Sequence, residues 1–250
     1  MTWREPVRVG VIDSGVHPAH PHIRAEALAT GVAILRNGEV AAGNEATLDR
    51  LGHGTAVTAA IQEKALGAIC VPVRVFHDAL RASAVALVAA IDWCVAARVD
   101  LVNLSLGTTN AAHRPAIEAA VQRAVRAGVA VVAARQAGDE PCWPGSASGA
   151  IGVVVGADCA RDGCFQLGDA FAASGEPRPI PGVPPRRNLV GISFAVANLT
   201  GLAARHCAEL PLALAGADRI DVLRRRLADQ AMANPASRST IQKQPTAPTA

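Results

Sequence analysis

Three short segments, far apart in the chain, carry side chains that together could perform nucleophilic catalysis. Asp13 precedes a Ser-Gly pair, His53 lies between two glycines, and Ser193 follows a Gly-Ile pair. A serine hydroxyl becomes a strong nucleophile when a histidine accepts its proton and a carboxylate orients the imidazole. These residue types therefore indicate acyl-transfer chemistry, provided that the fold brings them together.

Each of these residues also has an ordinary structural explanation when it is taken alone. Asp13 could simply begin a turn, because Asp-Ser-Gly is a common turn sequence. A histidine beside glycines is often a loop residue, and Ser193 is a favoured type of helix N-cap. The catalytic interpretation therefore depends on the combination, in which a histidine of near-neutral pKa serves as the general base.

The hydrophobic pattern places all three residues at the ends of predicted elements. The apolar run at residues 7–12 predicts a buried parallel strand with Asp13 at its carboxyl end, where catalytic groups of open α/β sheets gather. Small apolar residues at 55–64 and 195–204 predict closely packed helices that begin near His53 and Ser193. The free N–H groups at a helix N-terminus could hold an oxyanion.

The rest of the chain alternates between strand-like and helix-like segments. Strands are predicted at 7–12, 69–76, 101–104, 129–134 and 151–155, and helices at 55–64, 83–97, 115–127, 193–208 and 218–232. Such alternation favours a parallel sheet with helices on both faces. Residues 1–232 are predicted to form one domain, whereas the Pro-, Ser-, Thr- and Gln-rich residues 233–250 are predicted to be a disordered tail.

The order Asp13, His53, Ser193 resembles that of the subtilisin-like serine peptidases, and it differs from the order in chymotrypsin and in the α/β-hydrolases. The similarity extends over about residues 7 to 207. It implies a three-layer α/β fold with a mostly parallel central sheet and helices on both faces. It also implies a serine endopeptidase in which Ser193 is the nucleophile, His53 the general base and Asp13 its orienting acid.

The same resemblance implies a substrate cleft. Residues 99–107 are similar to the family segment that pairs with the bound peptide as an extra strand, and residues 128–134 are similar to the strand opposite. The residues expected to line the pocket before the cut are Ser105, Leu106, Gly107, Ala133, Ala134 and Arg135.

The chain departs from the family pattern at the oxyanion site. The family's Asn is absent, and direct alignment puts its place at Ala137. Gln136, one position earlier, has an amide donor, so Gln136 and the backbone N–H of Ser193 are predicted to hold the oxyanion. Ile192 stands where the family has Thr, and the family's Pro in the serine helix is missing. Two functions stay open: an active endopeptidase, or a catalytically weak or silent relative that binds peptides or a partner in the same cleft.

Composition excludes several other classes of function. The net charge of +3 is too small to indicate a nucleic-acid partner, and no run of 18 uncharged apolar residues predicts a membrane span. No glycine-rich phosphate loop follows a strand, which disfavours a nucleotide-binding enzyme. The expected partner is a peptide or protein substrate, and the short chain favours a dedicated role in processing one precursor peptide. The oligomeric state is left open.

No metal or cofactor is predicted. His17, His20 and His22 lie in a proline-stiffened loop without a partner carboxylate, and no acidic loop suits calcium. The chain has six cysteines, an even number that would permit disulfides in an exported protein. The N-terminus has no signal-peptide pattern, which predicts a cytoplasmic protein with reduced thiols.

Overall fold

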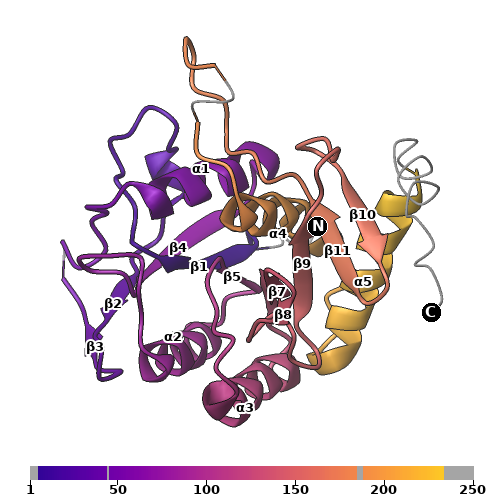
Figure 1. Cartoon of the computed structure of the whole chain (residues 1–250), viewed down its shortest axis with the longest axis horizontal. Helices are drawn as coiled ribbons and strands as arrows, with labels where there is room; N and C mark the ends of the chain where they lie inside the picture. Colours follow the sequence, from indigo (N-terminus) through magenta and orange to yellow (C-terminus); the bar gives the residue numbers. More distant parts are fainter. Residues whose placement is uncertain (1–4, 44, 185–187, 234–250) are drawn as a thin grey trace, which may run out of the picture.

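The structure is a computed structural model, and it describes residues 5–43, 45–184 and 188–233. Within these ranges one nine-stranded sheet lies between layers of helices (Figure 1). The strand order across the sheet is β10 (Cys164–Leu167), β11 (Ala170–Ala173), β9 (Ile151–Val155), β6 (Ala130–Ala134), β5 (Leu101–Leu104), β1 (Arg8–Asp13), β4 (Ile69–Arg74), β2 (Val32–Ile34) and β3 (Val40–Ala41).

The sheet is parallel except at its two edges. Antiparallel pairs join β10 to β11 and β2 to β3, whereas every other pair of neighbours is parallel. The carboxyl ends of the central strands β1, β5 and β6 therefore meet along one edge of the sheet. Side chains that follow these strands, including Asp13 and Ser105, are brought together although they are far apart in the sequence.

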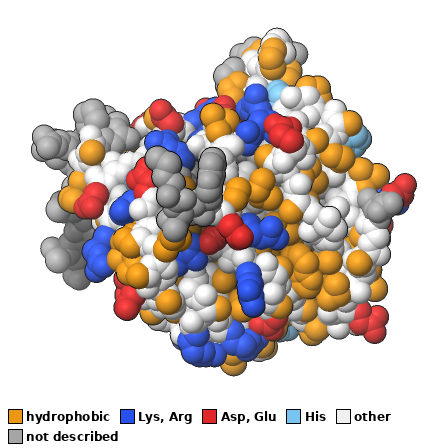
Figure 2. Space-filling model, turned by 180° about the vertical axis from the view of Figure 1, so that it is seen from behind, with side chains coloured by type: hydrophobic (Ala, Val, Ile, Leu, Met, Phe, Trp, Pro, Cys, Tyr) orange, Lys and Arg blue, Asp and Glu red, His pale blue; other side chains and the backbone are white. Residues whose placement is uncertain are grey.

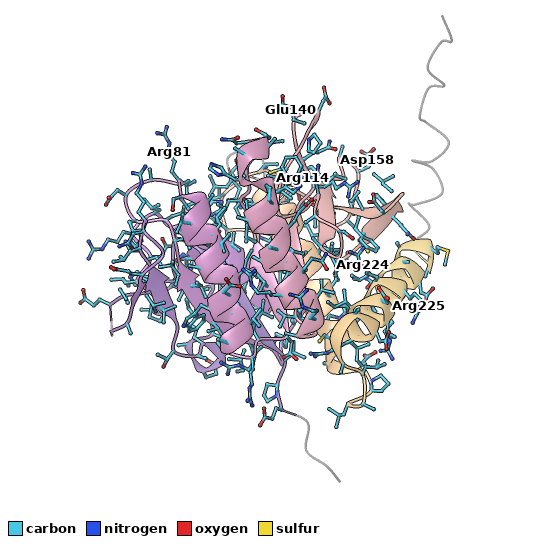
Figure 3. All side chains as sticks on the ribbon, turned by 90° about the horizontal axis from the view of Figure 1, so that it is seen from below. Arg81, Arg114, Glu140, Asp158, Arg224 and Arg225 are labelled. Carbon is cyan, nitrogen blue, oxygen red and sulfur yellow. The ribbon has the colours of Figure 1, made fainter. Side chains whose placement is uncertain are left out.

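Helices cover both faces of the sheet. On one face lie α1 (His53–Lys64) and α4 (Ile192–Ala208), which pack against each other, and on the other lie α2 (Ala84–Ala96) and α3 (Arg114–Arg126). Figure 3 shows α2 and α3 side by side on their face. The last helix, α5 (Gly216–Ala233), packs against β10 and α4. Two short 3₁₀ helices span Ala25–Ala27 and Ala111–His113.

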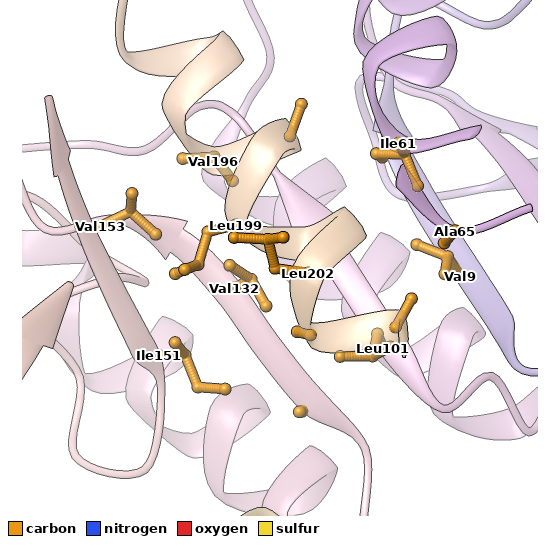
Figure 4. Packing of buried hydrophobic residues seen from close by; sticks show 14 of the residues in the cluster. Val9, Ile61, Ala65, Leu101, Val132, Ile151, Val153, Val196, Leu199 and Leu202 are labelled. Atoms are coloured by element: carbon orange, nitrogen blue, oxygen red, sulfur yellow. The ribbon is translucent and has the colours of Figure 1, made fainter. Parts of the chain in front are cut away.

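The alternation of apolar residues in the strands builds two separate cores. Successive side chains of a strand point to opposite faces. Val9 and Val11 of β1 accordingly join the core beneath α1 and α4, whereas Ile12 joins the core beneath α2 and α3. Figure 4 shows the first core, where Leu199 and Leu202 of α4 pack over Val132 and neighbouring strand residues. These packed layers hold the start of α4 rigidly over the sheet.

The predicted fold class is confirmed. All five predicted strands and all five predicted helices are present, with boundaries displaced by at most two residues. The sequence analysis missed the short strands β2 and β3, the hairpin β10–β11, and the two-stranded ribbon of β7 (Gln136–Ala137) and β8 (Glu140–Pro141). Of the predicted tail at 233–250, Ala233 is the last residue of α5 and the remainder lies outside the described residues.

Charged side chains are mixed on the surface. On the face shown in Figure 2, acidic and basic side chains are interspersed and do not form one large basic patch. In the part of the chain that the structure describes, no helix is both long and apolar enough to span a lipid bilayer.

Candidate active site

Asp13 and His53 are in direct contact. His53 Nδ1 lies 2.7 Å from Asp13 Oδ1, and the Asp13 side chain is completely buried. The same oxygen accepts a hydrogen bond from the backbone N–H of Ser14 at 2.7 Å. A carboxylate in this position accepts a hydrogen bond from Nδ1–H, so the lone pair of the imidazole is on Nε2, where a general base needs it.

The surroundings of His53 raise its pKa. Burial alone would lower the pKa, because it disfavours the charged imidazolium. The hydrogen bond and the charge of Asp13, with a smaller effect from the charge of Asp49, more than offset this, so the pKa of His53 lies above its ordinary value of 6.5. The site therefore stabilises the imidazolium that forms when His53 accepts a proton.

The start of α1 is held against the end of β1 by a close backbone contact. Ser14 Oγ accepts a hydrogen bond from the Gly54 N–H at 2.8 Å. A Cβ atom on Gly54 would lie 2.2 Å from the carbonyl oxygen of Gly15, which no side chain tolerates. Glycine at position 54 therefore permits the helix to begin close enough for His53 to reach Asp13.

Asp49 is a second buried carboxylate behind the pair. Its oxygens accept hydrogen bonds from the N–H groups of Leu51, Gly52 and Thr55 at 2.9 Å, and from the Thr55 hydroxyl at 2.6 Å. Burial alone would raise the pKa of Asp49. The hydrogen bonds, above all those from Thr55, lower the pKa by more than burial raises it, so the pKa of Asp49 lies below its ordinary value. Asp49 thus fixes the turn that leads into His53.

Ser193 lies in the first turn of α4, as predicted. Its carbonyl oxygen accepts a hydrogen bond from Ser105 Oγ at 3.3 Å. Behind it, Asn103 Nδ2 donates to Ser105 Oγ at 3.2 Å. The single hydroxyl proton of Thr200 is within hydrogen-bond distance of two acceptors, Asn103 Oδ1 at 2.9 Å and the Val196 carbonyl at 2.8 Å. The Asn103 and Thr200 side chains are fully buried, so this chain of hydrogen bonds joins β5 to α4 beneath Ser193.

The structure brings Ser193 to the same part of the molecule as His53. The ring of Phe194, the next residue, has its centroid 6.0 Å from that of the His53 ring. Among the described residues, no hydrogen bond joins the Ser193 hydroxyl to His53. Such contacts often tighten only when substrate binds.

One predicted wall of the substrate pocket lies directly beside Ser193. Ser105 is buried, Leu106 packs partly against the core, and Gly107 is exposed. A Cβ on Gly107 would lie 2.5 Å from Cys142 Sγ and 2.5 Å from the carbonyl oxygen of Trp143. Cys142 and Trp143 therefore back this wall, although the sequence analysis did not single them out.

The opposite predicted wall follows β6. Ala133 and Ala134 are buried at the end of the strand, and the Arg135 N–H donates to the Val153 carbonyl at 2.8 Å. The Arg135 side chain turns to the surface, where it pairs with Asp169 at 2.9 Å. The structure therefore orders this segment by backbone pairing and leaves the Arg135 guanidinium outside the pocket.

Gln136 is exposed in β7 and lines a surface hollow together with Arg114, Asp139 and Trp143. Within the described ranges it makes no hydrogen bond to Ser193. Its predicted role as an oxyanion donor requires the Gln136–Ala137 segment to move toward Ser193, and that role stays a prediction.

Sequence analysis missed Asp49, Asn103 and Thr200. Asn103 had a signal, because it is a polar residue in the middle of the apolar run 101–106. Buried polar groups need partners, and a polar residue in a central strand predicts one on a neighbouring element. Asp49 and Thr200 had no comparable signal, since their partners are set by the tertiary fold.

Within the described part of the chain, no group of three or more His, Cys, Asp or Glu side chains could hold a metal ion. All six cysteines are buried. The pKa of the Cys70 thiol is raised to about 12 by burial, and that of Cys159 to about 11, again mainly by burial. Burial therefore disfavours the nucleophilic thiolate form of these two residues.

Comparison with known proteins agrees with this geometry. Residues 4–174 match the model of the subtilase family, Peptidase_S8, a range that contains Asp13 and His53 and ends before Ser193. Over 137 residues the chain is 28% identical to subtilisin DY of Bacillus licheniformis; the match spans 51% of this chain and 46% of subtilisin DY, less than half of that protein.

Two solved structures are similar in fold. One is a lanthipeptide protease, with a TM-score of 0.64 and 17% identity over 88% of this chain and 79% of that one. The other is the nisin leader peptidase NisP from Lactococcus lactis, with a TM-score of 0.67 and 19% identity over 89% of this chain and 82% of that one.

Proposed function

This chain belongs to the subtilase family, and we propose that it is a serine endopeptidase with Asp13, His53 and Ser193 as its catalytic triad. The observation that supports this most directly is the 2.7 Å contact between the buried Asp13 carboxylate and His53 Nδ1, at the edge of the sheet where α4 presents Ser193.

The proposed reaction follows from the positions of these groups. Ser193 Oγ attacks the carbonyl carbon of the scissile peptide bond while His53 Nε2 takes the hydroxyl proton. The resulting imidazolium is stabilised by Asp13, and it gives the proton to the leaving amine as the C–N bond breaks. A water molecule then cleaves the acyl-enzyme ester by the same steps, which frees Ser193. The N-terminus of α4 supplies backbone N–H groups for the oxyanion.

The proposed substrate is a precursor peptide in the cytoplasm. The structural neighbours include a lanthipeptide protease and a nisin leader peptidase, and the second name refers to the leader of a peptide. The buried thiols of Cys70, Cys94, Cys142, Cys159 and Cys164 form no disulfides, which suits a reducing compartment.

A second candidate function is peptide binding without efficient cleavage. It is favoured by the missing oxyanion Asn and by the exposed position of Gln136. Loss of one oxyanion donor costs about 100- to 1,000-fold in turnover. A relative with this loss would still bind an extended peptide along the segment 105–107.

A fluorophosphonate probe separates the two functions. The probe reacts with a serine that is activated by a histidine, and mass spectrometry locates the adduct. We expect labelling at Ser193 that is lost in His53→Ala, together with cleavage of a peptide library. A folded protein that takes up no label and cleaves no peptide would support the binding function instead.

A further inference from the structure

A cavity of about 340 Å³ lies next to the catalytic pair and is not used by the proposed reaction. The first turns of α1 form one side, with Thr55 and Ala56, only two and three residues after His53. The segment that leads toward Ser193 forms another side, with Asn188 and Leu189. The cavity is therefore adjacent to the start of α1, which carries His53, and to the chain segment that precedes Ser193.

The cavity lies on the opposite side of His53 from the predicted pocket for the residue before the cut. That pocket is predicted at the ends of β5 and β6, whereas the cavity is lined by the loop that follows β1, by α1, and by residues at 177–180 and 188–189. A peptide that pairs with residues 105–107 and passes over Ser193 continues toward the cavity. Residues on the leaving side of the scissile bond are thus the part of a substrate that can reach it.

The lining of the cavity has an apolar part and a basic part. Ala56, Ala59, Ile180 and Leu189 make up the apolar wall, and the basic rim consists of Arg50, Arg178 and the loop histidines His17, His20 and His22. Arg178 is fixed there, because its Nη1 donates to the His22 carbonyl at 2.9 Å. The remaining N–H groups of a guanidinium stay available for an anion.

Among the described lining residues, the single carboxylate of Asp49 offsets only part of the charge of Arg50 and Arg178. Asp49 is buried, and both of its oxygens are occupied by the four hydrogen bonds from residues 51–55. The pKa of His22 is lowered, first by burial and then by the charges of Arg178 and His20, while the charge of Glu63 acts in the opposite direction. An anionic group is therefore the complementary ligand for the rim.

We propose that this cavity binds an acidic side chain, Asp or Glu, at one of the first three residues after the scissile bond. The side-chain methylenes contact the apolar wall, and the carboxylate pairs with Arg178 and Arg50. The proposal rests on the proposed endopeptidase function, and it adds a substrate class: peptides with an acid just after the cut.

The test uses a series of quenched fluorescent peptides that are identical except for Glu, Gln or Lys at one of those three positions. Every peptide has an amidated C-terminus, so that the side chain alone supplies the negative charge. We expect kcat/KM for the Glu peptide to exceed that of the Gln peptide roughly 2- to 10-fold, with Lys lowest. High salt should reduce the ratio, because it screens exposed charges.

Two variants locate the effect. Arg178→Gln should bring the Glu-to-Gln ratio close to one. Arg225→Gln removes the same charge from an exposed position on α5, remote from α1, and should keep the wild-type ratio (Figure 3). Binding of the same peptides to Ser193→Ala, measured by fluorescence anisotropy, reports the preference without cleavage.

The outcomes separate this proposal from the proposed function. Cleavage without an acid preference, or a preference that survives Arg178→Gln, overturns the cavity assignment and leaves the endopeptidase intact. Acid-selective binding that depends on Arg178, with no cleavage by the wild type, upholds the cavity and overturns the endopeptidase. The absence of both overturns both. A Gln peptide with a free C-terminal carboxylate that outperforms the Glu amide would assign the cavity to chain ends and overturn the side-chain proposal.

Discussion

The Ser105 hydroxyl donates a hydrogen bond to the carbonyl oxygen of Ser193, 3.3 Å away. The two residues are 88 positions apart in the sequence; Ser105 directly follows β5, and Ser193 lies in α4. The contact couples the wall of the predicted substrate pocket to the backbone of the predicted nucleophile. The position of Ser193 is thus set by the sheet as well as by its own helix.

The triad predicts that Ser193→Ala and His53→Ala each lower peptide turnover by about 10⁴-fold or more. The two losses should be similar, and the double variant should be little worse than either, because the residues act as a unit. Initial rates on the best peptide of a library measure this, with far-UV circular dichroism to confirm folding. Near-wild-type cleavage by purified Ser193→Ala would refute the assignment.

The raised pKa of His53 predicts how activity depends on pH. His53 must be neutral to accept the Ser193 proton, so kcat/KM should rise with pH through an apparent pKa above 6.5. The charge of Asp49 raises the pKa of His53, so Asp49→Asn should shift the rise of kcat/KM to lower pH.

The control for this shift is Glu45→Gln, which removes an exposed carboxylate from the same loop. Its pH profile should coincide with that of the wild type. A rate that is flat from pH 5 to 8 in a folded protein, where a histidine titrates, would contradict a histidine base.

The hydrogen bonds beneath Ser193 predict a positioning role for Thr200. Thr200→Val leaves Asn103 Oδ1 buried without its donor, which should lower the free energy of unfolding by about 1–3 kcal/mol. It should also lower kcat with little change in KM, since it disturbs the reacting serine and not the peptide-binding strand. Thr200→Ser keeps the hydroxyl and should restore kcat. Equal kcat for the Val and Ser variants would show that the network is merely structural.

The oxyanion prediction is tested at Gln136. Gln136→Ala should lower kcat about 10- to 1,000-fold with KM nearly unchanged, because the bond to the oxyanion forms in the transition state. Gln166→Ala, at an exposed glutamine of β10, is the matched control. If both variants turn over like the wild type, Gln136 remains at the surface during catalysis. Ala137→Asn would then show whether the family's donor raises activity.

Much of the fold was predictable because it depends on local patterns. The apolar runs at 7–12 and 101–104 predicted buried strands, and the small-residue segments at 55–64 and 195–204 predicted closely packed helices. The short strands β2, β3, β7 and β8 were not predictable, because two or three residues carry too little periodicity. They are formed by pairing with neighbours that the sequence does not reveal.

The sequence by itself determined the three reactive residue types, their order, and their places at the ends of elements. The tertiary structure alone decided that Asp13 and His53 are 2.7 Å apart, since that distance depends on the close approach of Gly54 to Gly15. It also decided that Asp49, Asn103 and Thr200 support the site, and that basic side chains gather beside it. Such contacts join distant parts of the chain, and only the packing of α1 and α4 against the sheet determines which of them form.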